Sequence, residues 1–252
     1  MNPYKLGSFD WMTSTKGVLS TKEKIRIINR TMVPTTIGLI KNKISHNNSD
    51  KGITVEQLRI PDTAIIKESI NELTNKANQS LINHSWRTYF WGGALGLIHQ
   101  KTFDHESLLT ASLLHDIGLT EAHIHDKGCK CFTLESAENF ERLASKVDYP
   151  VDKVELVKDA ICMHMNGYIE EDDPVEVKLL QYGASCDVIG EKWSELPEYY
   201  RNDILKQYPR KNFNTAFKRL LREESKSVKN SRTALLSVLG LPIMIDINPF
   251  KE

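Results

Sequence analysis

The chain has 252 residues, of which 40% are hydrophobic and 26% are charged. This composition is ordinary for a globular protein and supplies enough apolar material for one sizeable core. Lysine and arginine together number 33, as do aspartate and glutamate, so no net charge draws the chain to nucleic acid or to an anionic membrane. Residues 1–17 lack the apolar core of a secretory signal, and no apolar run reaches the ~20 residues that span a bilayer. We therefore expect a cytoplasmic protein that contacts neither nucleic acid nor membrane.

The start of the sequence predicts one short helix. Ser20 and Glu23 have the spacing of a capping box, in which each residue accepts a hydrogen bond from the backbone of the other. The stretch that follows, residues 25–32, has a helical pattern, and the polar stretch at 46–52 predicts a loop. We take residues 1–57 as an N-terminal extension with a short helix.

Helical spacing of apolar residues dominates the part of the chain from 58 to 230. Apolar residues recur there at intervals of three and four rather than in alternation. The segments with this spacing are 61–79, 82–100, 105–119, 134–147, 152–165, 175–193 and 214–225. The sequence therefore predicts an all-α bundle over 58–230, followed by a closing segment at 231–252 whose residues 241–250 we expect to be extended.

Three glycines lie in the later half of the second of these segments. Gly92, Gly93 and Gly96 lower the helix propensity of an otherwise strongly apolar helix. Such a cost usually means that another backbone comes close, so we expect a neighbouring helix to pack tightly against this one.

Residues that ligate metal ions recur on separate apolar helices. His84 lies early on one helix, His115 and Asp116 at the end of another, and Asp187 on a later one. Bundles build metal sites from inward side chains on facing helices. Adjacent residues on a helix point about 100° apart, so a His-Asp pair can share one ion only near a helix end, which Gly118 supplies. Each residue alone has an ordinary explanation as a core histidine or a cap, but the joint pattern predicts a metal site.

The pattern H…HD…D in an all-α chain resembles that of the HD-domain metal hydrolases. The segments NHSWRTYFWG, SLLHDIGLT, FTLESA, GASCDVIG and QYPRKNF, with a helix ending in MH, resemble in order those of the cyanamide hydratase-like branch. The resemblance extends from about Leu58 to about Glu224. It implies an HD-domain helical bundle over 58–230 with its metal site between core helices. The ligands it implies are His84, His115, Asp116 and Asp187.

Two places depart from the pattern of that branch. Thr133 stands where the branch usually has glutamate and Ser136 where it has glycine, and the segment SVKNSRT at 227–233 matches poorly. In such a fold these parts are expected near the site entrance, so the departures bear on the substrate more than on the metal.

Arg87 and His164 are the further candidates for chemistry. Arg87 follows His84 by three residues on the same helical face, where it either orients a substrate or pairs with Asp187. His164 could contact substrate, exchange a proton or complete a second metal site, or it could be a neutral core histidine. We assign catalytic roles to Arg87, His164 and Asp116. The residues expected to bind substrate are Arg87, His164, Thr120 and Glu135.

A set of two histidines and two carboxylates suits one divalent transition-metal ion, Zn²⁺, Fe²⁺, Mn²⁺ or Co²⁺, and the resemblance favours zinc. Zinc lowers the pKa of a coordinated water toward ~7 and thereby supplies hydroxide at neutral pH. The resemblance implies a lyase that hydrates a small nitrile-like substrate, as in the conversion of cyanamide to urea.

Three alternatives stay open. A phosphohydrolase acting on a nucleotide or small phosphoester needs several cations near the ion, and Arg87 is the one that the motif region clearly supplies. A di-iron oxygenase needs two further histidines between the HD pair and Asp187; His164 is one, but His125 lies too close after Asp116 to start a new helix. A non-catalytic binding module is expected to have lost a ligand. We expect a small-molecule substrate and leave open whether the chain forms a homo-oligomer.

Overall fold

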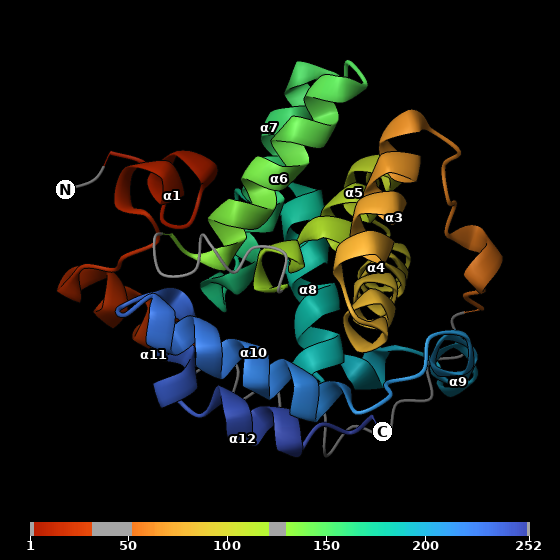
Figure 1. Ribbon diagram of the computed structural model, residues 1–252. Coiled ribbons are helices and arrows are strands. Elements are labelled where there is room, and N and C mark those ends of the chain that lie inside the picture. The colour runs from red at the N-terminus through yellow and green to blue at the C-terminus, as the bar shows by residue number, and fades with distance from the viewer. Residues whose placement is uncertain (1–2, 32–51, 121–129, 251–252) are drawn as a thin grey trace.

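The computed structural model describes residues 3–31, 52–120 and 130–250, and the regular elements in these ranges are helices (Figure 1). Residues 21–31 are helical. The other α-helices are α1 (Phe9–Thr15), α3 (Ala64–Lys76), α4 (Gln79–Ile98), α5 (His105–Leu114), α6 (Phe132–Lys146), α7 (Val151–Met163), α8 (Val175–Ile189), α9 (Glu198–Gln207), α10 (Phe213–Ser227), α11 (Arg232–Val238) and α12 (Leu241–Asp246). Short 3₁₀ turns are η1 (Val55–Gln57), η2 (Ile117–Leu119), η4 (His164–Asn166) and η5 (Trp193–Glu195). The predicted all-α bundle is confirmed.

The centre of the bundle is the crossing of α4 and α8. Gly92 of α4 faces the carbonyl of Leu179, and Gly183 of α8 faces the carbonyl of Thr88, so close that a Cβ atom at either glycine would collide with it. The expectation that a backbone approaches the glycines of α4 is thus confirmed at Gly92. Gly93 and Gly96 instead leave room for neighbouring side chains. The two helices that carry His84 and Asp187 are therefore in direct backbone contact.

The remaining helices surround this pair. α5 packs against both α4 and α8, and α7 against α5, α6 and α8. α10 contacts α4 and α12 contacts α8, so these two helices lie across one end of the core, below it in Figure 1. α1, from the start of the chain, packs on α6 and α7. Within the described ranges, no helix is long and apolar enough to cross a membrane.

Local sequence signals fix several helix ends. The capping box is present, with Glu23 Oε2 accepting from the amide of Ser20 at 2.8 Å and Ser20 Oγ from the amide of Glu23 at 3.4 Å. Residues 241–250 were expected to be extended, and this is wrong because Leu241–Asp246 form α12. Gly240 adopts a φ of 101°, which turns the chain into this helix. Leu241 and Ile245, four residues apart, then bury one helical face.

The two departures from the cyanamide hydratase-like pattern contact each other. Arg232, within the segment 227–233, is fully buried, and its guanidinium donates to Thr133 Oγ1 at 2.9 Å. It also donates to the carbonyl of Cys162 at 2.7 Å and to Asn166 Oδ1 at 2.6 Å. Arg232 thereby anchors α11 to the bundle, and the altered pair forms a structural contact.

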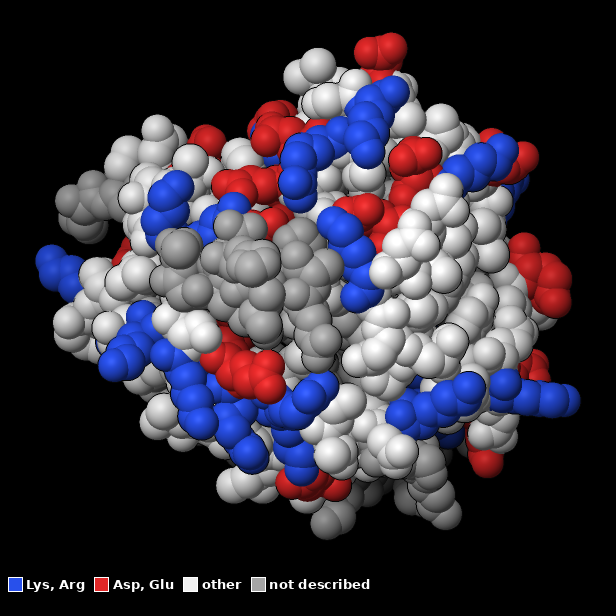
Figure 2. Space-filling model, viewed as in Figure 1, with Lys and Arg blue, Asp and Glu red and all other residues white. Residues whose placement is uncertain are grey.

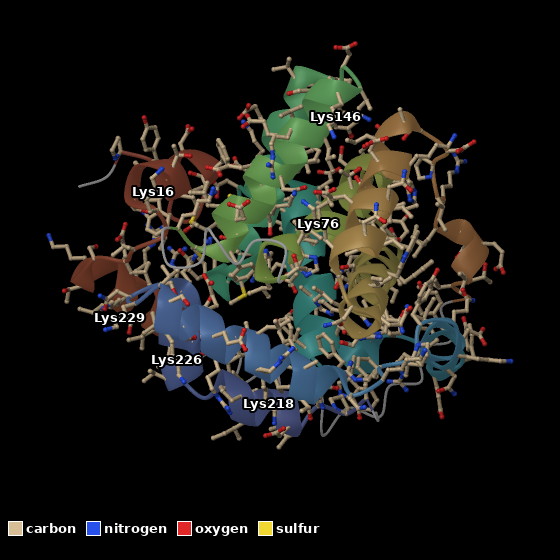
Figure 3. The ribbon with its side chains drawn as sticks, viewed as in Figure 1. Lys16, Lys76, Lys146, Lys218, Lys226 and Lys229 are labelled. Carbon is tan, nitrogen blue, oxygen red and sulfur yellow. The ribbon has the colours of Figure 1, made fainter. Side chains whose placement is uncertain are left out.

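Charged side chains are mixed over the surface. Lys and Arg lie beside Asp and Glu over much of the face shown in Figure 2, in keeping with equal numbers of each sign. Lys218 and Lys226 lie on α10, and Lys229 lies just after it (Figure 3). Lys218 forms an ion pair with Asp246 of α12. This pair joins the two helices that lie across the end of the core.

Candidate metal centre

The end of α5 brings a histidine and an aspartate together. α5 ends at Leu114, and the chain then bends, with Asp116 at φ −110° and ψ 7° outside the helix. His115 and Asp116 consequently face His84 of α4, and one ligand atom from each of the three lies within 4.8 Å of the others. The expectation that a helix end allows this pair to share one ion agrees with this geometry. His84, His115 and Asp116 form a group that could hold a metal ion.

Hydrogen bonds at the outer nitrogens orient the two rings of this group. His84 Nδ1 lies 2.7 Å from Asp187 Oδ2, and His115 Nδ1 lies 2.8 Å from the carbonyl oxygen of Ser112. Both partners are acceptors, so each Nδ1 carries a proton, and either ring presents a lone pair at Nε2 whenever it is neutral. The two Nε2 atoms lie 3.2 Å apart. Nitrogens at this distance either share a proton or face a common cation.

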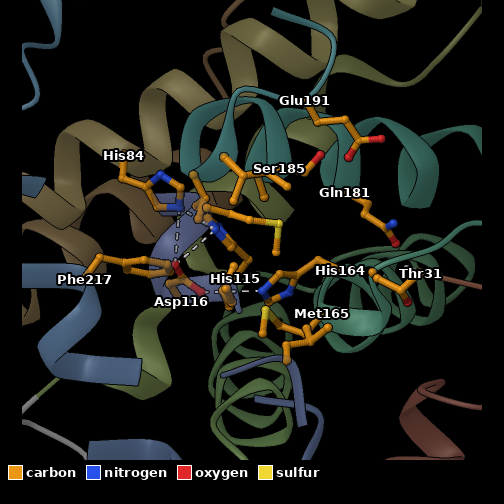
Figure 4. Close-up of a pocket in the computed structure, with 17 residues that line it drawn as sticks. Thr31, His84, His115, Asp116, His164, Met165, Gln181, Ser185, Glu191 and Phe217 are labelled. Atoms are coloured by element: carbon orange, nitrogen blue, oxygen red, sulfur yellow. Dashed lines mark hydrogen bonds and ion pairs between the residues drawn. The ribbon is translucent and has the colours of Figure 1, made fainter. Parts of the chain in front are cut away.

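His164 completes the surroundings of Asp116. It follows α7 and donates from Nδ1 to the carbonyl of Ile161 at 2.7 Å, which leaves its Nε2 facing Asp116 Oδ1 at 3.5 Å. His84 and His115 face the other oxygen, Oδ2, at 3.4 and 3.3 Å (Figure 4). Burial lowers the pKa of His164, against the opposing effect of Asp116. The ring of His164 therefore favours its neutral form, which can accept a proton.

The carboxylate of Asp116 is buried and short of hydrogen bonds. Among the described residues, neither of its oxygens has a partner in normal hydrogen-bond geometry, although the side chain is only 2% exposed. Burial opposes its charge, but the charge on His115 and the rings of His164 and His84 outweigh burial and hold its pKa well below the usual range. An ionised buried carboxylate of this kind is costly unless a cation joins it. The nitrogen and oxygen donors suit a divalent transition-metal ion.

Asp187 contacts Nδ1 of His84, on the side of the ring away from His115. Its Oδ1 accepts from Arg87 Nε at 2.7 Å, Trp91 Nε1 at 3.0 Å and Arg210 at 3.2 Å, while Oδ2 accepts from Arg87 at 2.9 Å as well as from His84. Burial opposes the charge on Asp187, but Arg87 and Arg210 hold its pKa well below the usual range. This is the arrangement of a carboxylate that orients a metal-binding histidine. Direct ligation by Asp187 stays a prediction.

Two partners of Asp187 were missed from the sequence. Trp91 lies seven residues after His84 and four after Arg87, which places all three on one face of α4, so helical spacing could have indicated it. Arg210 lies in the loop before α10, within QYPRKNF, and nothing in its spacing relates it to α8.

A cavity of about 90 Å³ opens onto His84, His115 and Asp116, which we call the metal-binding group. Its walls come from α8, α10, α11 and α12 and from the turn after α7. The apolar lining residues are Met165, Ala184, Val188, Ile189, Phe217, Leu236, Leu241 and Met244. The polar ones, besides the site histidines and Asp116, are Thr31, Gln181, Ser185 and Glu191. In the described part of the chain, this lining contains no lysine or arginine.

Three residues expected to bind substrate are engaged elsewhere. Arg87 is fully buried against Asp187, one of the two arrangements left open by the sequence. Thr120 donates its hydroxyl to the carbonyl of Ile117 at 2.7 Å, and Glu135 forms an ion pair with Lys130 at 2.5 Å. None of the three lines the described cavity, whereas His164 does.

Comparison with protein families and with curated proteins gave one assignment. Residues 81–188 match the HD domain family. No curated protein matches the chain. The matched range contains α4 from Leu81 onward, all of α5 and nearly all of α8, and with them the three grouped donors and Asp187. The chain therefore resembles HD domains over residues 81–188.

Proposed function

We propose that this HD domain holds one divalent transition-metal ion, with zinc as the first candidate, between His84, His115 and Asp116. The observation that carries the proposal is the convergence of imidazole Nε2 atoms on a buried carboxylate that lacks hydrogen bonds. HD domains are generally metal-dependent hydrolases, and such an ion activates water at neutral pH. We infer that the chain is a metal-dependent enzyme acting on a small molecule.

The chain's own residues supply orientation and proton transfer. Asp187 and the Ser112 carbonyl hold the rings of His84 and His115 with Nε2 toward the site. His164 is positioned to accept or return a proton at Nε2, because its Nδ1 is committed to the Ile161 carbonyl. The apolar wall around these groups limits the access of bulk water.

Hydration of a small nitrile-like compound, such as cyanamide to urea, is the reaction that we propose first. A phosphoester would carry negative charge into a lining that has no lysine or arginine among the described residues, and Arg87 is committed to Asp187. The cavity of about 90 Å³ is also far below the ~300 Å³ at which drug-sized ligand sites begin. Both observations favour a small uncharged substrate over a nucleotide.

Elemental analysis of the purified protein is expected to find roughly one transition-metal ion per chain, most often zinc. The reason is that one set of donors, each buried and oriented, converges at one point. Less than a tenth of an equivalent after metal is added back would contradict the proposed site. Urea or amide release from cyano compounds is then compared with phosphate release from nucleotides, with metal-stripped protein as the blank. Metal-dependent phosphate release without hydration of any cyano compound would favour the phosphohydrolase.

Asp187→Asn is expected to weaken metal binding by about 10- to 100-fold without changing the stoichiometry. An amide at this position can still accept from His84 Nδ1, but it loses the charge that supports the ring. Metal titration measures the affinity, and the melting temperature of the metal-free variant checks that it is folded. Trp91→Phe, which removes one donor to Asp187 Oδ1, is the milder companion variant. Complete loss of binding in folded Asp187→Asn would mean that Asp187 ligates the ion directly.

A further inference from the structure

Two buried polar side chains that line the cavity have no hydrogen-bond partner among the residues that the structure describes. Gln181 is 6% exposed and Thr31 is 7% exposed, and both line the cavity. Neither side chain forms a hydrogen bond with another residue in the described ranges, and the Thr31 hydroxyl oxygen is fully enclosed. In Figure 4 both are drawn on the side of the cavity away from His84. The end of the cavity remote from the metal-binding group therefore offers unused hydrogen-bonding capacity.

Helix α8 fixes the position of Gln181. Gln181, Ala184, Ser185 and Val188 follow one another at intervals of three or four residues, and all four line the cavity. They form one face of the helix, while Asp187 on another face contacts His84. The same rigid helix thus holds the His84 ring and presents the Gln181 amide.

The residues around Gln181 disfavour anionic ligands. The other walls are apolar, with Val188, Leu236 and Leu241 among them. Asp116 and Glu191 are the carboxylates of the lining, and the described lining contains no lysine or arginine to offset them. The Gln181 amide lines this wall and has no hydrogen-bond partner among the described residues, so an uncharged ligand can hydrogen-bond to it.

We propose that Gln181, assisted by Thr31, determines substrate specificity by binding a neutral hydrogen-bonding group, such as a hydroxyl or carboxamide, at the end of the substrate remote from the reacting carbon. The substrate is then a small uncharged molecule with a reactive group at one end, a polar group at the other and a short apolar body. This inference rests on the proposed function, because it assumes that the reacting end lies at the metal-binding group.

The test compares probes that differ only at the remote end. Each of three ω-hydroxynitriles of increasing length, beginning with 3-hydroxypropionitrile, is paired with the alkyl nitrile in which methyl replaces hydroxyl. Binding is measured by ligand-observed NMR titration of the full chain, separately from turnover. For at least one length, the wild-type protein is expected to bind the hydroxynitrile about tenfold more tightly, as one hydrogen bond of ordinary net strength gives. The anion cyanoacetate is expected to bind more weakly than either.

Gln181→Met keeps the length of the side chain and removes its hydrogen bonds, so the tenfold preference is expected to disappear. Its melting temperature is expected to stay at or above that of the wild type, because an unpaired amide leaves an apolar wall. Thr31→Val, which is close to isosteric, is expected to reduce the preference by a smaller factor. Gln207→Met, an exposed glutamine at the end of α9, is the matched control and is expected to leave the preference unchanged.

The outcomes separate the specificity inference from the proposed reaction. A preference that disappears in Gln181→Met supports the inference even where no cyano compound is hydrated, in which case the proposed reaction fails alone. Hydration of nitriles together with an unchanged preference in folded Gln181→Met would overturn the inference and leave the reaction standing. Equal wild-type binding of the two members of every probe pair would also overturn it.

Discussion

Replacing His115 or Asp116 with alanine is expected to remove metal and activity together, with metal affinity falling by more than the ~100-fold that loss of a supporting residue causes. Each variant removes one of the three donors that lie within 4.8 Å of one another among the described residues. Metal titration and turnover of the metal-loaded protein measure the two losses. The melting temperatures of the metal-free variants check that each is folded.

His105→Ala is the matched control on the same helix. His105 opens α5, half-buried, with its Nδ1 lying 3.1 Å from the hydroxyl of Tyr89 and outside the metal-binding group. It is expected to retain a full equivalent of metal. His123→Ala is expected to do the same, although His123 lies outside the described residues. Retention of metal by both His115→Ala and Asp116→Ala, or its loss in His123→Ala, would show that the site has been placed wrongly.

Arg87→Met is expected to lower the free energy of unfolding by about 3–5 kcal/mol, the usual effect of removing one partner of a buried ion pair. For a chain of this size the melting temperature should then fall by roughly 6–20 °C. Arg87 and Asp187 are both fully buried, and Arg87 makes a two-pronged contact with the carboxylate. Arg87→Lys is expected to rescue little, since an ammonium cannot reproduce the paired geometry.

Thermal and denaturant unfolding of the metal-free protein measure the effect of Arg87→Met apart from metal binding. Arg142→Met is the control, because the side chain of Arg142 is 63% exposed and lies 4.0 Å from its acidic partner, a surface pair worth little. Unchanged stability in Arg87→Met, combined with a raised KM, would assign Arg87 to the substrate instead.

The metal-binding group could be predicted from sequence because local rules place each member. Apolar spacing located α4 and α5, and the end of α5 at Leu114 allows His115 and Asp116 to face one point. Asp187 was predicted on the correct helix, but spacing along the chain does not say which nitrogen of His84 its carboxylate meets. That depends on Arg87 and Arg210, which hold the carboxylate behind the ring.

The part of the cavity that Gln181 lines could not be predicted from the sequence for a similar reason. Gln181 is an ordinary glutamine on an apolar helix, and only the positions of its neighbours show that its amide has no hydrogen-bond partner in the described part of the chain. Thr120 and Glu135 were expected to bind substrate, yet Thr120 donates to a backbone carbonyl and Glu135 pairs with Lys130. Residues 241–250 were expected to be extended because their apolar run hides the four-residue spacing of Leu241 and Ile245.

The walls of the cavity come from two different parts of the chain, and this bears on how its substrate could change. The metal-binding group and the α8 face that carries Gln181 lie within residues 81–188, whereas Leu236, Leu241 and Met244 come from the short helices near the end of the chain. Substitutions in α11 and α12 can therefore reshape the space around the substrate body while the donors and their hydrogen bonds stay in place. Under the proposed function, exchanging these few helical turns would change which substrate body fits while the donors stay in place.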